Sequence, residues 1–138
     1  MHEKRYRITL LFNANKVYDR QVVEGVGEYL QASQTDWDIF IEEDFRCRIE
    51  NIREWLGDGV IADYDDSTIE TLLANVSVPI VGVGGSYHQP QDYPPVHYIA
   101  TDNAALVESD FLHLKEKGIN RFAFYGLPAS SGKRWSQE

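Results

Sequence analysis

The strongest constraint on the fold is a regular alternation of short apolar runs with stretches of helical spacing. Residues 8–12 form a largely apolar run of strand length, and residues 20–33 then place Val22, Val26 and Tyr29 on one helical face. This succession of a strand-length apolar run and a helical stretch recurs along the chain. Apolar strands separated by amphipathic helices are typical of a parallel sheet covered on both faces. Because crossovers between parallel strands are right-handed, the sequence predicts an α/β fold with a doubly wound parallel sheet.

The pattern predicts six strands and four helices. The strands are expected over residues 7–13, 37–42, 59–63, 78–83, 97–100 and 121–126, and the helices over residues 20–33, 46–56, 67–74 and 104–118. Asp19 suits the N-cap of the first helix, and Ser67 suits that of the third, with Glu70 at the capping-box position. Gly57 and Gly118 are expected to end the second and fourth helices.

Ligands of doubly wound sheets bind beyond the carboxyl ends of the strands. This rule selects the loops at residues 13–19, 42–44, 63–66 and 84–87, and the loop after Tyr125. They contain amides, charged groups and aromatic rings, namely Asn13, Asn15, Tyr18, Asp19, Arg20, Tyr64 and Tyr87. Polar groups of this kind hydrogen-bond sugar hydroxyls, while aromatic faces cover the C–H surface of a sugar. The same residues would also suit a solvated loop rim with helix caps, so both interpretations stay open.

Composition restricts the partners of these residues. Lys and Arg number 13 and Asp and Glu number 22, which gives a net charge of −9. Phosphate contacts need clustered basic side chains, so this charge argues against direct nucleic-acid binding and against docking on anionic membranes. Cys47 is the only cysteine, which excludes an internal disulfide. The apolar runs are too short for a signal peptide or a membrane span, so a cytoplasmic location is expected.

Known nucleotide, metal and catalytic motifs fit poorly. Residues 25–30 and 82–87 lack the last glycine of a dinucleotide fingerprint, and residues 126–133 space the glycines of a phosphate-binding loop incorrectly. The histidines are not spaced as a metal pair, and no nucleophile stands beside a base. We therefore expect no enzyme activity and no cofactor. The remaining alternative is a small flavodoxin-like enzyme or receiver domain that uses the Asp63 region with a divalent metal.

Several short segments occur in an order that resembles the ligand-binding module of the LacI/GalR family. They are DGVIA at 58–62, VPIVGV at 78–83, TDN at 101–103, HL and GINRFA between 113 and 123, Gly126, and SSGKR at 130–134. Residues 7–30 and 94–103 are similar to a narrower group, the xylose-responsive enterobacterial regulators. The resemblance covers nearly the whole chain.

The resemblance implies a periplasmic-binding-protein-like fold of type I, in which two lobes are joined by three crossovers. By this comparison residues 1–101 form the first lobe. Residues 102–138 form the first crossover and an incomplete start of the second lobe, so the second lobe is truncated. The helical stripe that contains Phe111 and Leu114 would then lack its covering partner, which favours association or instability.

The resemblance also implies the function: the ligand-sensing module of a D-xylose-responsive transcriptional activator. D-xylose or a related pentose would bind between the lobes. DNA would be contacted only through a missing carboxyl-terminal domain of the AraC helix-turn-helix type, and the complete protein is expected to be a homodimer. The positions that match the family's ligand loops are Tyr18, Asp19, Asp63, Gly84 and Gly85, with Arg134 near the place of a further arginine contact.

Overall fold

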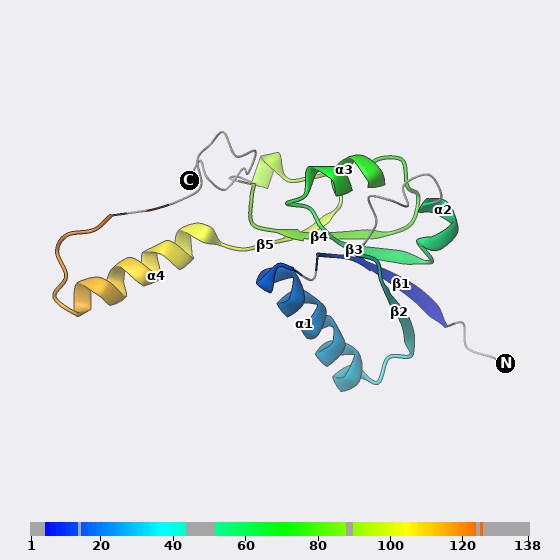
Figure 1. Ribbon diagram of the computed structural model, residues 1–138, viewed down its shortest axis with the longest axis horizontal. Coiled ribbons are helices and arrows are strands. Elements are labelled where there is room, and N and C mark those ends of the chain that lie inside the picture. The colour runs from blue at the N-terminus through cyan, green and yellow to red at the C-terminus, as the bar shows by residue number, and fades with distance from the viewer. Residues whose placement is uncertain (1–4, 14, 44–51, 88–89, 124, 126–138) are drawn as a thin grey trace.

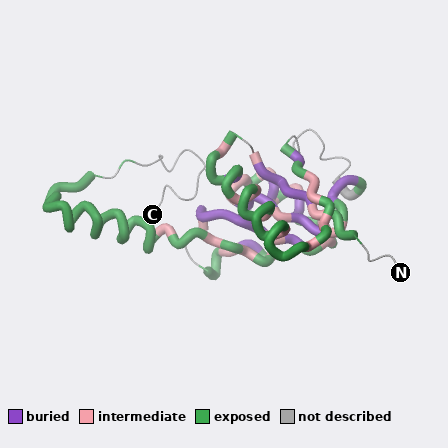
Figure 2. The backbone as a smooth tube through the Cα atoms, turned by 90° about the horizontal axis from the view of Figure 1, so that it is seen from below, coloured by how far each residue is buried: buried purple, intermediate pink, exposed green. Residues whose placement is uncertain are grey.

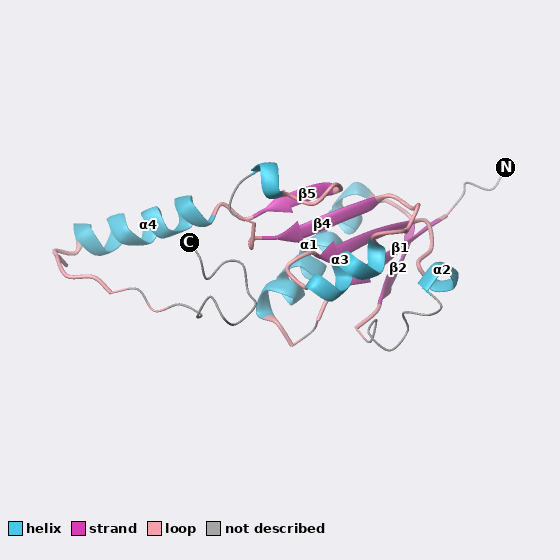
Figure 3. Ribbon diagram, turned by 90° about the horizontal axis from the view of Figure 1, so that it is seen from above, coloured by secondary structure: helices cyan, strands magenta, loops and turns pink. Residues whose placement is uncertain are grey.

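The computed structural model describes residues 5–13, 15–43, 52–87, 90–123 and 125. Its centre is a five-stranded parallel sheet with the order β2-β1-β3-β4-β5 (Figure 3). The strands are β1 (Tyr6–Leu11), β2 (Trp37–Ile41), β3 (Gly59–Asp63), β4 (Ile80–Gly84) and β5 (His97–Ala100). The chain moves outward from β1 to β2 and then returns past β1 to β3. This order confirms the predicted doubly wound parallel sheet and places its switch point between β1 and β3.

Helices lie on both faces of the sheet. Helix α1 (Val17–Ser33) covers one face, and α2 (Ile52–Trp55) and α3 (Ser67–Leu73) lie on the other (Figure 1). A short 3-10 turn, η3 (Pro90–Asp92), precedes β5, and α4 (Asn103–Glu116) follows it. Among the described residues, no helix has the length and apolar character needed to cross a membrane.

The residues at the end of β1 alternate between two cores. Leu10 and Phe12 are buried beneath α1, whereas Leu11 is buried beneath α2 and α3. Successive residues of a strand point to opposite faces, so a continuous apolar run serves both cores. The core beneath α1 also contains Val83, with Val22, Val23 and Val26 packed against it, and the other contains Trp55, Leu56, Val60, Ala62, Tyr64, Ile69, Leu73 and Ile80.

Helix α1 begins at Val17 rather than at Arg20, and the prediction of Asp19 as its N-cap is wrong. Lys16 occupies the N-cap position without a side-chain hydrogen bond. Asp19 lies in the first turn, where its carboxylate accepts a hydrogen bond from the backbone N–H of Asn13 at 2.8 Å. Asp19 therefore provides a hydrogen-bond acceptor for the backbone just after β1 and does not cap its own helix.

The ends of α2 and α3 confirm one expectation and correct another. Gly57 adopts a φ of +75° after α2, as its predicted role requires. Of the helix predicted over residues 46–56, residues 46–51 lie outside the described part of the chain. The N-cap of α3 is Asp66, which accepts from the N–H of Thr68 at 2.9 Å, so the predicted cap at Ser67 is wrong.

Helix α4 differs from α1 and α3 because none of its residues is buried (Figure 2). Its N-cap is Asp102, whose carboxylate accepts from the N–H of Ala105 at 2.9 Å. Phe111 and Leu114 are 42% and 39% exposed, which confirms that this stripe is uncovered in the structure. Gly118, with a φ of +83°, follows the helix as predicted.

The strand predicted over residues 121–126 is wrong for the residues that the structure describes. Residues 121–123 and 125 are not in a strand. An apolar run becomes a strand only where another strand can pair with it. Here Phe122 is 45% exposed and packs its ring against that of Phe111, with the ring centroids 4.9 Å apart. The apolar run at these residues was therefore not sufficient to form a strand.

Candidate functional site

A cavity of about 250 Å³ lies at the carboxyl edge of the sheet. The loops after β1, β3 and β4 meet the first turn of α1 and the start of α4 around it. It is lined by Lys16, Tyr18, Asp19, Asp63, Asp65, Gly85, Thr101, Asn103 and Leu106. The cavity adjoins the switch point between β1 and β3, which is the usual ligand position in open sheets of this kind. Its volume is slightly below that of typical small-molecule sites.

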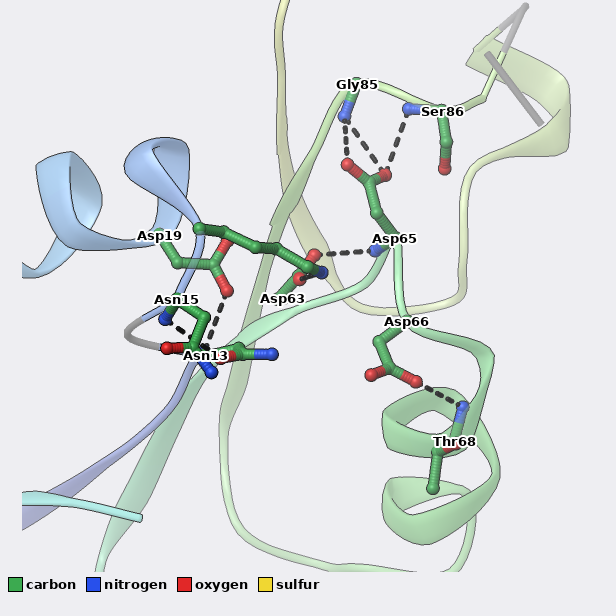
Figure 4. A network of polar contacts seen from close by, with 10 residues as sticks. Asn13, Asn15, Asp19, Asp63, Asp65, Asp66, Thr68, Gly85 and Ser86 are labelled. Carbon is green, nitrogen blue, oxygen red and sulfur yellow. Dashed lines mark hydrogen bonds and ion pairs between the residues drawn. The ribbon is translucent and has the colours of Figure 1, made fainter. Parts of the chain in front are cut away.

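The loop between β1 and α1 folds around the side chain of Asn13 (Figure 4). The amide oxygen of Asn13 accepts from the N–H of Asn15 at 3.0 Å, and its carbonyl accepts from the N–H of Lys16 at 3.0 Å. The backbone N–H of Asn13 is the group that donates to Asp19. Asparagine suits this tight turn because its short side chain bonds the backbone two residues further on. The turn brings Lys16 and the buried Asp19 to the cavity wall.

Lys16 and Asp63 form an ion pair in the lining of the cavity. The ammonium nitrogen of Lys16 lies 3.0 Å from the Oδ2 atom of Asp63, whose side chain is 5% exposed. The other carboxylate oxygen of Asp63 accepts from the backbone N–H of Asp65 at 2.9 Å. Residues from the first and third strand loops are thus joined by charge-assisted hydrogen bonds, which are stronger and shorter than neutral ones.

Burial and neighbouring charges shift the pKa values of Asp19 and Lys16 at this site. Burial is the main cause that raises the pKa of Asp19; the neighbouring charge of Asp63 adds to the shift, while the N–H of Asn13 opposes it. Burial alone would lower the pKa of Lys16, but its hydrogen bond to Asp63 and the negative charges nearby raise that pKa overall. Lys16 therefore remains a cation at neutral pH, placed among carboxylates. Charged donors and acceptors side by side are suited to a ligand rich in hydroxyl groups.

Asp65 bonds to the backbone that follows β4. Its two carboxylate oxygens each lie 3.2 Å from the backbone nitrogen of Gly85, and Oδ1 also accepts from the N–H of Ser86 at 3.0 Å (Figure 4). Gly84 is necessary for this approach, because a Cβ atom there would lie 2.4 Å from Oδ1 of Asp65. Asp65 therefore bonds the loop after β4 and does not cap α3, whose N-cap is Asp66.

The segment between β5 and α4 forms the remaining wall of the cavity. The Asn103 side-chain amide donates to the carbonyl of Gly85, and the N–H of Thr101 donates to the carbonyl of Gly84 at 2.9 Å. The hydroxyl groups of Tyr18 and Thr101 lie 3.3 Å apart. The segment that leads into α4 is thus hydrogen-bonded both to the β4 loop and to the first turn of α1.

Two tyrosines of the selected loops, Tyr64 and Tyr87, are not among the residues that line this cavity. Tyr64 is 3% exposed and packs in the core beneath α3, where burial, followed by the charge of Glu70, raises its pKa to about 12. Tyr87 packs edge to face against Tyr93 and Tyr98. Loop position alone did not show that these rings are needed for packing.

The structure brings together four of the six predicted site residues. Tyr18, Asp19, Asp63 and Gly85 line one cavity. Gly84 lies immediately behind it, against Asp65, and Arg134 lies outside the described residues. Whether these residues contact a sugar stays a prediction.

Sequence reasoning missed other residues that line the cavity, namely Lys16, Asp65, Thr101, Asn103 and Leu106. Lys16 and Asp65 lie inside loops that were correctly selected, so the carboxyl-end rule could have included them. Thr101 and Asn103 join the site only through contacts with residues far away in sequence. Arg20 instead borders a smaller cavity of about 120 Å³ with Phe12, Asp19, Val23, Ile41 and Glu43.

A match to a family model decides the family. The model described as the XylR N-terminal domain, of the periplasmic-binding-protein-like type I, matches residues 7–104. The chain belongs to this family. The XylR N-terminal domain thus includes the five strands of the sheet, the loops around the cavity and the segment that leads into α4.

Relatives with the same domain are regulators. The xylose operon regulatory protein of Escherichia coli strain K12 is 80% identical over all 138 residues, which make up 35% of its own length. The protein of the same name from Haemophilus influenzae is 55% identical over 36% of its length. A solved structure of the xylose-binding transcription activator XylR matches 99% of this chain and 34% of that chain, with a TM-score of 0.87 and 75% identity. The chain therefore spans about a third of the length of the relatives it matches.

The alternative of a metal-dependent receiver or flavodoxin-like enzyme gains no support. Within the described ranges, no group of three or more His, Cys, Asp or Glu side chains is arranged to hold a metal ion. The relatives are named as regulators.

Proposed function

We propose that this chain contributes to the ligand-sensing module of a D-xylose-responsive transcriptional activator in the cytoplasm. The observation that carries this proposal is the cavity at the switch point, where Asp19 and Asp63 flank the cation of Lys16. We choose xylose as the sugar because the relatives are named as a xylose operon regulatory protein and a xylose-binding transcription activator. The module performs no catalysis and needs no cofactor, because its task is to change conformation on binding.

The polar groups of the cavity fit a pentose. Adjacent hydroxyl groups of a sugar each donate one hydrogen bond and accept others, so they need both acceptors and donors at short range. Asp19 and Asp63 supply acceptors, while Lys16 and the amide of Asn103 supply donors. The half-exposed ring of Tyr18 borders the same space and suits the C–H face of a sugar.

In our proposal these residues form one side of the ligand site. Residues 1–101 act as the first lobe, and residues 102–138 act as the first crossover and the start of the second lobe. The sugar binds between the two lobes, and Arg134 is kept as a contact from the second. Closure of the lobes around the sugar shifts the population toward the arrangement that favours activation. DNA binding belongs to a carboxyl-terminal domain, and the assembled regulator is a homodimer.

The test uses a full-length chimera, in which this chain replaces the matching 138 residues of the Escherichia coli relative. Calorimetric titration with D-xylose should show saturable binding. Asp19→Asn and Asp63→Asn should each weaken that affinity at least about tenfold, because each removes a charge-assisted acceptor. The matched control is Glu28→Gln, which neutralises an exposed carboxylate on α1 away from the cavity. Unchanged affinity in both Asp variants would remove the site assignment, and a chimera that does not bind xylose would contradict the proposed function.

A further inference from the structure

We propose that Asp65 is a positioning residue of the sugar site, in an inference that rests on the proposed function. Its role is to hold the backbone of residues 84–86 in the shape that the cavity requires. Asp65 fixes this segment from the β3 side, and Asn103 fixes it from the α4 side. The position of the cavity wall then depends on a carboxylate that acts through the backbone.

The first argument is the number of bonds that Asp65 makes to one short segment. Three of its contacts, all of 3.0–3.2 Å, go to the N–H groups of Gly85 and Ser86. These residues follow the end of β4, beyond Gly84 and Ala100, the last residue pair of the ladder between β4 and β5. Without Asp65, the N–H groups of the buried residues Gly85 and Ser86 would lose this acceptor. Unsatisfied donors of this kind change the conformation of the loop that contains them.

The second argument comes from the packing around Gly84. A Cβ atom at Gly84 would lie 2.4 Å from Oδ1 of Asp65 and 2.8 Å from the hydroxyl of Tyr98. That hydroxyl is buried and has no hydrogen-bond partner among the described residues. The carboxylate of Asp65 therefore packs directly against the backbone of Gly84 while it accepts from Gly85 and Ser86. This close packing leaves the segment at residues 84–86 little freedom to move as long as Asp65 is in place.

The third argument is that Gly85 is held at both of its polar atoms. Its N–H donates to Asp65, and its carbonyl accepts from the side-chain amide of Asn103. Asn103 is the first residue of α4, so the position of Gly85 is tied to the segment that leads out of the sheet. Displacement of Gly85 would move the cavity wall and loosen the start of α4 together. Asp65 therefore influences both the site and the segment that we assign as the crossover.

The experiment compares Asp65→Asn with its neighbour Asp66→Asn. Asn keeps the shape of Asp65 but loses the charge and one acceptor oxygen, whereas Asn at position 66 remains a good N-cap for α3. The first measurement is amide hydrogen exchange at Gly85 and Ser86 in this chain without sugar. We expect exchange about tenfold faster in Asp65→Asn and unchanged in Asp66→Asn. A residue that served only as a direct sugar contact would leave sugar-free exchange unaltered, and that result would overturn the proposal.

The second measurement is the D-xylose affinity of the full-length chimera with the same substitutions. The affinity should fall about tenfold with Asp65→Asn and remain unchanged with Asp66→Asn. Faster exchange with unchanged affinity would overturn the positioning role. Asn103→Ala provides a second variant at a partly exposed position; it should speed amide exchange at Gly85 about threefold in the sugar-free chain, and unchanged exchange there would contradict the proposed support of Gly85 by Asn103. A parent chimera that binds no xylose would refute the proposed function, whereas the exchange data would still report on Asp65.

Discussion

The sheet, with the helices packed on it, and the region from α4 onward contain similar sequence patterns but bury them to very different extents. At the end of β1 and directly after it, Leu10, Leu11 and Phe12 are at most 2% exposed. In α4, Leu112 is 49% exposed, and beyond it Phe122 is 45% exposed. Both regions contain the apolar residues that their expected elements require, as a continuous run in β1 and as a helical stripe in α4. An amphipathic pattern therefore predicts the element, but a packed partner decides whether its apolar face leaves water.

The largest expected effect separates the two regions directly. Leu11→Ala opens a cavity between β1 and the helices above it and should cost about 2–5 kcal/mol of unfolding free energy. Leu112→Ala on α4 should cost less than about 0.5 kcal/mol, because its site is already solvated. Urea denaturation followed by circular dichroism measures both. Equal losses in the two variants would show that α4 is packed in solution.

A second pair of substitutions sharpens the comparison at two glycines. Gly84→Ala forces a Cβ into contact with Asp65 and should destabilise the chain by about 1–3 kcal/mol. Gly27→Ala has the opposite expected sign, since an added Cβ on α1 meets nothing within 4 Å and alanine favours a helix by about 0.8–1 kcal/mol. Thermal melts of the two variants provide the test. A stabilised Gly84→Ala would contradict the close contact between the β4 loop and Asp65.

The smallest expected effect concerns pH and Asp19. Burial raises its pKa in the folded state above the ordinary value of 3.8, so the folded chain binds this proton more readily than the unfolded chain. Protonation of Asp19 therefore stabilises the folded chain. This stabilisation is fully present below pH 3.8 and is lost as the pH rises through the raised pKa of the folded state. Asp19→Asn should gain up to about 1 kcal/mol at pH 7 while weakening xylose binding. Melting temperatures measured from pH 3 to pH 7 check the sign, and a variant less stable than the parent at pH 7 would contradict it.

Much of the fold was predictable because its evidence is local. The continuous apolar run at residues 8–12 identified a strand buried on both sides, and the alternation with helices identified the doubly wound sheet. Position 17, the start of α1, was missed because no side chain marks that N-cap: Lys16 makes no capping bond. The strand at residues 121–126 was predicted wrongly because its pattern says nothing about a neighbouring strand.

The sequence predicted where the candidate site lies in the fold, but it predicted only some of the residues that line the cavity. The rule for carboxyl ends of strands located the loops of Tyr18, Asp63 and Gly85, which do meet at one cavity. The role of Asp65 depends on a partner 20 residues further along the chain. Such a bond follows from the register of β3 beside β4, which no local pattern contains. Long-range hydrogen bonds of this kind are what the structure adds to the sequence.

The most direct test is to map which residues of this chain respond to D-xylose. A titration followed by amide NMR should shift the signals of residues 15–19, 63–65 and 101–103 and of Gly85, even if the affinity of this chain alone is low. The amino ends of the strands, on the opposite edge of the sheet, should remain unchanged. Shifts at the smaller cavity beside Val23 and Ile41, with none at Asp63 or Gly85, would contradict the account.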